Sequence, residues 1–346
     1  MEQSAQQIAI DIKQKALSLG FDLCRITSAD PSARRDYYLN WLAAGQHGEM
    51  YFLQERADER LAPRVYFPPA RSIVCVAMNY HVPLEQSDAP SPSRARVARY
   101  ALGDDYHKHI KDRLHDLADY IRDSWPGTKT RSGVDTAPIM ERELAARAGI
   151  GWQGKNSCII HPQIGSWLFL GEVLVSLDLP PDSPATDHCG TCTRCIDACP
   201  TGAITAPYQL DARKCISYLT IEHEGEIAAD LKRQMGDWLF GCDICQDVCP
   251  FNSRAPDAID ESLRPRFPGG TLDAAAVADW TLEEYHTVTR RSAMRRVSLP
   301  VFQRNARIAR QNIKENNEEN IEENLEGEHA RESIADPNPP AAAQRV

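Results

Sequence analysis

Eight of the eleven cysteines in this chain of 346 residues lie between positions 189 and 249, and their spacing is typical of an iron–sulfur protein. The first run has the C-x₂-C-x₂-C-x₃-C-P pattern of bacterial two-cluster ferredoxins, with Cys189, Cys192, Cys195, Cys199 and Pro200. The second run is an incomplete copy, with Cys242, Cys245, Cys249 and Pro250, and Cys215 lies upstream as its missing member.

In this pattern the last cysteine of each run serves the other cluster. Three thiolates on one tight loop reach three irons of a single cubane, whereas the cysteine before proline begins a helix that leads toward the second cubane. The rule predicts one [4Fe–4S] cluster on Cys189, Cys192, Cys195 and Cys249. It predicts the other cluster on Cys199, Cys215, Cys242 and Cys245.

These cysteines could alternatively bind structural zinc, but the cysteine ligands of zinc sites usually come as two separated pairs. A disulfide framework would fit a small secreted domain better than this chain. The pattern therefore favours two neighbouring clusters that relay single electrons in a reducing, cytoplasm-like compartment. Cys24 and Cys75 lie in apolar runs, so we expect both in the core.

A second region with chemical potential is the stretch 134–156. It places an acid, Asp135, at the end of a predicted strand, followed by a helix and a glycine-rich loop that contains Lys155 and Asn156. Such a region can line a cofactor pocket in an α+β domain. Taken alone, Asp135 is equally consistent with a helix N-cap, and the glycines of the loop with simple turns.

The elements that must position these groups follow from hydrophobic spacing and turn residues. We predict helices over residues 4–19, 30–44, 104–122 and 138–148, and strands over residues 21–27, 72–80, 129–134, 157–161 and 167–177. Residues 81–95 are rich in Pro and Ser and read as a surface loop. Helices and strands alternate without strict βαβ order, which favours an α+β fold with a mixed sheet over a doubly wound one.

The chain divides into four predicted segments. Residues 1–180 form the α+β domain, and a proline-rich linker leads into a ferredoxin-like domain over residues 181–255. Residues 256–312 look like a partial, HEAT-like helical-repeat segment. Residues 313–346 are rich in Glu and Asn, then in Pro and Ala, and we expect them to be disordered.

Charge is distributed unevenly. The net charge is −10, yet residues 290–310 contain seven arginines and no acidic residue. An acidic chain with such a basic segment can still contact nucleic acid locally. The apolar runs are too short or too interrupted to span a bilayer, and the first residues lack the features of an export signal, so we expect a cytoplasmic protein without a membrane partner.

Together these motifs resemble those of the epoxyqueuosine reductase family. Its members are cobalamin-dependent iron–sulfur enzymes that carry out the last step of queuosine formation in tRNA. The matching pieces cover about residues 5–310: residues 100–107, 134–156, 165–172, both cysteine runs, 215–220 and 238–246. The combination is much more specific than the ferredoxin pattern alone. Some relatives have a cysteine where this chain has Ala98, so that cysteine is not needed for the common mechanism.

The resemblance implies that the enzyme reduces epoxyqueuosine to queuosine at the wobble position of tRNA. The clusters would pass electrons one at a time to cobalamin in the N-terminal domain. Asp135 matches the proton donor of the family, and we expect burial to raise its pKa. The cobalamin contacts would come from Arg60, Asp135, Lys155, Asn156, Ser157, Ile159, Leu170, Ser217 and Asp243. His107 and His109 read better as exposed helix histidines than as cobalt ligands.

The expected partners are tRNA carrying epoxyqueuosine and an electron donor of the flavodoxin or ferredoxin type, with the enzyme as a monomer. The predicted phosphate contacts are Arg290, Arg291, Arg295, Arg296, Arg304 and Arg307. Many family members continue into further helical repeats that grip the tRNA, whereas this chain turns acidic after about Arg310. Two alternatives stay open: a small-molecule reductase like the reductive dehalogenases, and an electron-transfer ferredoxin with a docking domain.

Overall fold

The structure is a computed structural model that describes residues 3–84 and 93–334. Its main sheet has the strand order β1-β2-β7-β4, formed by Leu23–Ser28, Ser72–Asn79, Leu168–Val175 and Thr130–Gly133. Every neighbouring pair in this sheet is antiparallel. The prediction of a mixed sheet is therefore wrong for this main sheet. Residue spacing cannot distinguish the two cases, because strand direction depends on which end of the sheet each connection returns to.

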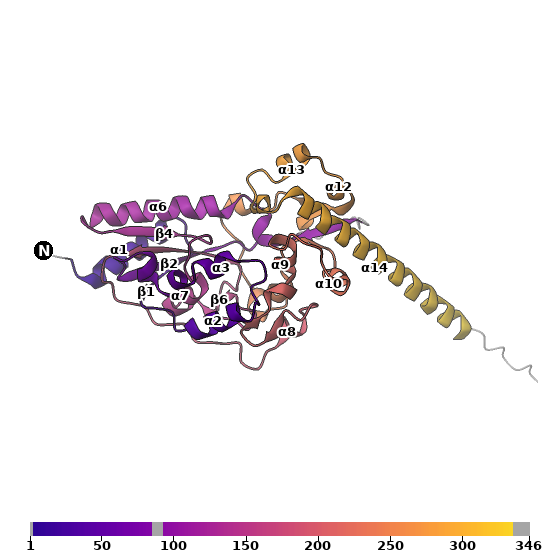
Figure 1. Ribbon diagram of the computed structural model, residues 1–346, viewed down its shortest axis with the longest axis horizontal. Helices are drawn as coiled ribbons and strands as arrows, with labels where there is room; N and C mark the ends of the chain where they lie inside the picture. Colours follow the sequence, from indigo (N-terminus) through magenta and orange to yellow (C-terminus); the bar gives the residue numbers. More distant parts are fainter. Residues whose placement is uncertain (1–2, 85–92, 335–346) are drawn as a thin grey trace, which may run out of the picture.

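Helices cover both faces of the main sheet (Figure 1). α1 (Ala5–Ser18) and α6 (Tyr106–Ser124) pack with Val74, Val76 and Met78 of β2, and α7 (Glu141–Ala148) packs with its residues Ile73, Cys75 and Ala77. All eight residues of β2 are therefore buried. Cys24 and Cys75 lie in these two cores, as predicted. The remaining short elements of the domain are α2 (Arg35–Ala43), α3 (Phe52–Glu55), α4 (Ala57–Leu61), α5 (Pro63–Tyr66), β5 (Trp152–Gln153) and β6 (Ile159–Ile160).

A second sheet joins three segments that the sequence had divided. β3 (Arg94–Val97) lies between β10 (Trp238–Phe240), which is parallel to it, and β11 (Thr271–Asp273), which is antiparallel. The core beneath this sheet includes Val97, Phe240 and Phe302, one residue from each predicted segment. The three segments therefore share a core, and the cysteine segment cannot pack as an isolated unit.

The cysteine segment consists of short elements connected by loops. They are α8 (Arg194–Asp197), β8 (Ile204–Ala206), β9 (Gln209–Leu210), α9 (Ile216–Ile221), α10 (Ala229–Gln234) and α11 (Ile244–Asp247). α8 and α11 each begin inside a cysteine run and each contain one of its cysteines. Helices of four residues have little stability of their own, so their positions depend on the loops and on the neighbouring domain.

The C-terminal part contains α12 (Ala274–Ala278), α13 (Leu282–Val288) and the long helix α14 (Leu299–Ile334). Disorder was expected from residue 313, but α14 continues to Ile334 and projects away from the body (Figure 1). Side-chain pairs four residues apart support this extension: Gln311 with Glu315 and Lys314 with Glu318. The rest of the predicted tail, residues 335–346, lies outside the described residues, as do residues 85–92 of the predicted loop. In the described part of the chain, every helix is too short or too polar to cross a membrane.

Glu172 is an unusual residue in the centre of the main sheet. It pairs with Cys75 on one side and Gly133 on the other, and it is 0% exposed. Neither of its carboxyl oxygens has a hydrogen-bond partner within the described residues. Burial, and then the nearby charge of Glu141, raise the pKa of Glu172 well above its usual value. A carboxyl in this position is therefore protonated in the folded chain.

We expect Glu172→Gln to change how stability depends on pH. In the wild-type chain this carboxyl holds its proton when folded and loses it when unfolded, so stability decreases as pH rises above about 4.5. The loss is about 1.4 kcal/mol for each pH unit between the two pKa values. Thermal unfolding from pH 5 to pH 8 should show a smaller decrease in Tm for the variant. Glu283→Gln, at an exposed position, should leave the decrease unchanged.

Candidate active site and iron–sulfur centres

The structure brings the eight clustered cysteines together in two groups of four. The thiol of Cys195 interacts electrostatically with those of three others, namely Cys189, Cys192 and Cys249. In the second group Cys215 interacts with Cys199, and Cys242 and Cys245 both interact with Cys215. Each group therefore draws thiols from both cysteine runs, so the two groups lie next to each other.

The grouping is informative about the metal. In bacterial two-cluster ferredoxins each run of cysteines contributes ligands to both clusters. Here Cys249 joins the first group and Cys199 the second, which is the same exchange between runs. The grouping therefore matches the cubane assignment that the spacing predicted.

The N-terminal domain holds both cysteine loops through the segment 152–156. The indole nitrogen of Trp152 donates to Sγ of Cys189 over 3.4 Å. Lys155 Nζ donates to the carbonyl oxygens of Gly190 (2.7 Å) and Cys192 (2.9 Å). The amide of Asn156 donates to the carbonyl oxygen of Cys245 over 3.2 Å. N–H groups around cluster sulfurs both position a cluster and tune its potential.

Cys158 is a ninth cysteine at this junction, and its position upstream of both cysteine runs predicted no role for it. Its thiol hydrogen-bonds with Cys245, and this bond lowers the pKa of Cys158 to about 7. Its backbone N–H donates to the side chain of Asn156 over 3.2 Å. The sequence feature that could have predicted a role for Cys158 is its position directly after Asn156-Ser157, which resembles the family's cofactor loop.

Asp135 follows β4 in a strained backbone conformation. Its φ angle is +48°, and Ser157, another predicted site residue, has a φ angle of +67°. Non-glycine residues rarely adopt such angles, and strain of this kind concentrates at functional sites. The backbone N–H of Asp135 donates to the carboxyl group of Glu141 at the start of α7. The loop is thus held in one shape, with the Asp135 side chain 51% exposed.

His107 lies between two carboxylates. Its Nδ1 is 2.7 Å from Asp105, and its Nε2 is 2.9 Å from Asp135. Burial lowers the pKa of His107, but hydrogen bonds and charge from the two aspartates outweigh burial and raise it to about 9. The expectation of an exposed histidine is wrong, because the side chain is 29% exposed and both ring nitrogens are engaged. The second histidine, His109, has its Nε2 3.9 Å from Asp104.

The electrostatics at Asp135 also differ from expectation. Burial raises its pKa, but the hydrogen bond and charge of His107, with Arg296 and Arg142, lower it more, so the net pKa is below its ordinary value. The predicted increase is wrong because a cationic imidazole ring lies against the carboxylate. The neighbouring acid responds in the opposite direction. Burial, and then the charge of Asp135, raise the pKa of Glu141 to about 8.

Arg60, predicted to contact a cofactor, is buried beside the Asp135 loop. It is 9% exposed, and its guanidinium is 3.5 Å from the carbonyl oxygen of Ala137. Its Nε has no hydrogen-bond partner within the described residues. The guanidiniums of Arg60 and Arg296 each lie 5.9 Å from the ring of Phe52. A buried donor without a partner at this point fits a site that receives a polar group from outside the chain.

The other predicted contacts divide into two kinds. Asp243 and Ser217 lie beside the second cysteine group: Asp243 accepts hydrogen bonds from Arg99, and Ser217 hydrogen-bonds with the thiol of Cys215. Ile159 and Leu170 pack in the core beneath α7, with Leu170 only partly buried. The ammonium group of Lys155 is bound by the cysteine loop through the carbonyl oxygens of Gly190 and Cys192.

The predicted arginine set is also divided. Arg304 is fully engaged by backbone carbonyl oxygens of Leu219, His223 and Gly225, at 2.6 to 2.7 Å. Arg296 pairs with Glu222 and reaches toward Asp135, and Arg291 pairs with Asp104. Arg290, Arg295 and Arg307 are exposed. Arg304 is therefore a structural residue, whereas the others can meet a ligand.

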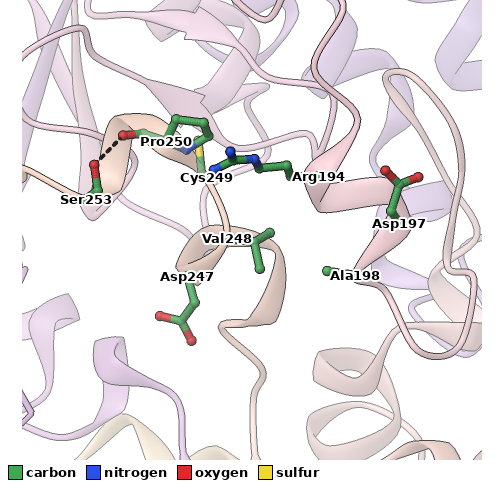
Figure 2. Close-up of a pocket in the computed structure, with 8 residues that line it drawn as sticks. All are labelled: Arg194, Asp197, Ala198, Asp247, Val248, Cys249, Pro250 and Ser253. Atoms are coloured by element: carbon green, nitrogen blue, oxygen red, sulfur yellow. Dashed lines mark hydrogen bonds between the residues drawn. The ribbon is translucent and has the colours of Figure 1, made fainter.

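A hollow on the surface lies between α8 and α11, next to Cys249 of the first cysteine group (Figure 2). Arg194 and Asp197 line it from α8, and Asp247 and Val248 line it from the other run. The loop over residues 187–194 beside it is largely exposed. The first group is thus accessible from outside, whereas burial raises the pKa of the second-group thiols Cys215 and Cys242.

Comparisons with known proteins agree with this geometry. Residues 188–252 match the family described as "4Fe-4S double cluster binding domain", and residues 60–136 match "Epoxyqueuosine reductase QueG, DUF1730". The epoxyqueuosine reductase of Xanthomonas campestris pv. campestris is 42% identical over 313 residues, which cover 88% of this chain and 86% of that protein. The enzyme of Escherichia coli K12 is 41% identical over 309 residues, covering 88% and 81%.

Solved structures lead to the same family. An epoxyqueuosine reductase crystallised with an epoxyqueuosine-modified tRNA-Tyr stem loop has a TM-score of 0.84 and 31% identity, covering 90% of this chain and 83% of that one. A Bacillus subtilis epoxyqueuosine reductase, with its catalytic aspartate loop swung out of the active site, has a TM-score of 0.83 and 29% identity over the same shares. By sequence and by structure, this chain belongs to the epoxyqueuosine reductase family.

Proposed function

We propose that this chain reduces epoxyqueuosine to queuosine at the wobble position of tRNA, the last step of queuosine formation. The observation that carries the proposal is the convergence on Asp135. Asp135 lies in a strained loop, and Arg60, whose Nε has no partner within the described residues, contacts this loop at Ala137. Arg142, whose charge acts on Asp135, donates to the carbonyl oxygen of Ser157 beside the segment that holds both cysteine loops. These are the residues through which the chain resembles its family.

The reaction replaces the epoxide with a carbon–carbon double bond and releases the oxygen as water, which consumes two electrons and two protons. Cobalamin, when bound, supplies a cobalt ion that takes up electrons singly and delivers them to the epoxide. We propose that Arg60, Ser157, Ser217 and Asp243 hold it, with the backbone of residues 155–157 facing its amide arms. The side chain of Lys155 is left out, because the cysteine loop already engages it.

We propose the cluster ligands that the spacing predicted: Cys189, Cys192, Cys195 and Cys249 for one, and Cys199, Cys215, Cys242 and Cys245 for the other. The accessible first group would receive electrons, and the second, next to Ser217 and Asp243, would pass them on. A one-electron carrier of the flavodoxin or ferredoxin type fits this entry point. Failure of reduced flavodoxin and ferredoxin to bleach the clusters would count against such a donor.

For the tRNA, we propose contacts from the segment 256–312. Arg290, Arg295 and Arg307 are exposed there, whereas Arg291 pairs with Asp104 and Arg296 with Glu222, so these two would exchange partners to bind phosphate. Arg296 also lies close enough to Asp135 to interact with its charge. A relative solved with a modified tRNA stem loop supports a nucleic-acid substrate. Phosphate contacts would position the stem loop, and the modified base would reach Asp135 past Arg296.

The activity should appear when anaerobically prepared protein, loaded with iron, sulfide and cobalamin, is given a reductant and tRNA containing epoxyqueuosine. We expect queuosine in the digested tRNA by mass spectrometry. Asp135→Asn should lower the rate about 100-fold or more, because proton transfer to the leaving oxygen is lost. Asp116→Asn, at an exposed position on α6, should retain the rate. Turnover without cobalamin would contradict the proposal.

The cluster assignment predicts the iron content of two cysteine variants. Cys242→Ala removes one ligand of the second cluster, so iron should fall from about eight to about four atoms per chain. Cys158→Ala should retain about eight, because Cys158 contacts Cys245 without belonging to either group of four. Iron and acid-labile sulfide analysis checks both. A loss of iron in the Cys158 variant would make that thiol a ligand.

The phosphate contacts can be measured through salt dependence. Each of Arg290→Ala and Arg295→Ala should weaken tRNA binding and reduce the slope of log K against log salt by about one. Arg71→Ala, an exposed arginine at the edge of the N-terminal domain, should change neither the affinity nor the slope. If all three variants kept the wild-type slope, the RNA would have to bind another face of the protein.

A further inference from the structure

The proposed reaction needs a proton that Asp135 does not itself hold near neutral pH. Its carboxyl is ionised there, because the charges of His107, Arg296 and Arg142 keep its pKa low. A carboxylate can deliver a proton to the epoxide oxygen only if a neighbour supplies one. The following inference rests on the proposed function and concerns which neighbour does so.

The contacts of His107 identify the neighbour. Asp105 is the N-cap of α6 and accepts a hydrogen bond from the backbone N–H of His107 over 3.0 Å, so the acid and the ring are held by the same turn. The ring then lies between Asp105 and Asp135, at 2.7 and 2.9 Å. Carboxylates only accept hydrogen bonds, and a neutral imidazole has a single N–H. A ring that donates to both carboxylates is therefore an imidazolium.

We propose that His107 is the positioning residue that supplies, through Asp135, the proton used to release the epoxide oxygen. The proton leaves Nε2 of His107 for Oδ2 of Asp135, and the Asp135 carboxyl gives it to the oxygen as the carbon–oxygen bond breaks. His107 becomes neutral and Asp135 returns to the carboxylate. The electrons for breaking the carbon–oxygen bond come from the clusters, so His107 and Asp135 contribute a proton only.

The surroundings support this direction of transfer. Asp105 stabilises the imidazolium from the far side, and Tyr106 stacks on the ring at 4.1 Å between centroids. The ring is partly exposed, so solvent can reprotonate it for the second proton of the reaction. Asp135 is faced by Arg142, Arg296 and Glu141 as well as by His107. Raised to about 9, the pKa of His107 keeps the ring charged at neutral pH.

A purely structural role would differ in one respect. If His107 only orients Asp135, a neutral donor such as glutamine would replace it, and the titration of the ring would not matter for turnover. If His107 supplies the proton, the rate must follow the protonation of the ring. The two roles therefore separate in the pH profile of the reaction.

The first measurement needs neither cobalamin nor turnover. Histidine-labelled full-length chain, with its clusters, is titrated by NMR, and His107→Gln identifies the His107 signal. We expect a pKa near 9 that falls by at least about one unit in Asp105→Asn, since that change removes one of the two stabilising charges. His115→Gln, an exposed histidine on the same helix, should leave the His107 signal unchanged. A pKa near 6.5, or no response to Asp105→Asn, would overturn the proposal.

The second measurement is single-turnover conversion of epoxyqueuosine-containing tRNA from pH 6 to pH 10. The wild-type rate should fall as pH rises above the pKa of His107. In Asp105→Asn this alkaline decrease should begin at a lower pH, shifted by as many pH units as the pKa of His107 shifts in the NMR titration. His107→Gln should be about 10-fold slower or worse and should lack the limb. A His107→Gln enzyme with wild-type rate and profile would reject the role. No conversion by wild type would instead reject the proposed function, while the titration stands on its own.

Discussion

The packing of segment 152–158 against the two cysteine loops is the contact on which the rest of the molecule depends. Trp152, Lys155 and Asn156 each donate to a cysteine loop, two of them to backbone carbonyl oxygens and one to a thiol. The cysteine segment has only short helices, and its small core, which includes Leu219 and Trp238, is completed by Ala98 and Ile308 from the neighbouring segments. Electron transfer between cofactors requires fixed separations, and these hydrogen bonds fix them. The same segment carries Ser157, which has a strained backbone and accepts a hydrogen bond from Arg142, a residue whose charge acts on Asp135.

Asp135 has a low pKa but is surrounded by side chains that hold protons. An acidic group needed for proton transfer would usually be buried to raise its pKa, but here it is half exposed and lies against an imidazolium. Two neighbours, His107 and Glu141, hold protons where Asp135 does not. The ionisable groups of the site thus come from three elements: α6, α7 and the loop after β4. In the proposed mechanism the group that stores a proton is separate from the group that meets the substrate, which would leave the Asp135 carboxylate accessible.

The second sheet explains how a C-terminal segment can take part in this chemistry. β3, β10 and β11 come from three segments of the chain, and one apolar core beneath them includes Phe240 and Phe302. Arg304 strengthens the joint by donating to carbonyl oxygens at the end of α9 and beyond. Because this core is shared, Arg296 lies close to Asp135 although the two residues are 161 positions apart in the sequence.

The sequence alone determined the features that depend on local geometry. Cysteine spacing indicated two cubane sites, because the reach of a tight loop is a local property, and hydrophobic periodicity located most helices and strands. The combination of the Asp135 motif with both cysteine runs and the other matching pieces indicated the family. Only the tertiary structure decided the direction of the main strands, the engagement of Lys155 and Arg304, the position of Cys158 and the partners of His107. Each of these depends on a contact between residues distant in sequence, and so does the sign of the pKa shift at Asp135, which is set by an imidazolium that α6 places there.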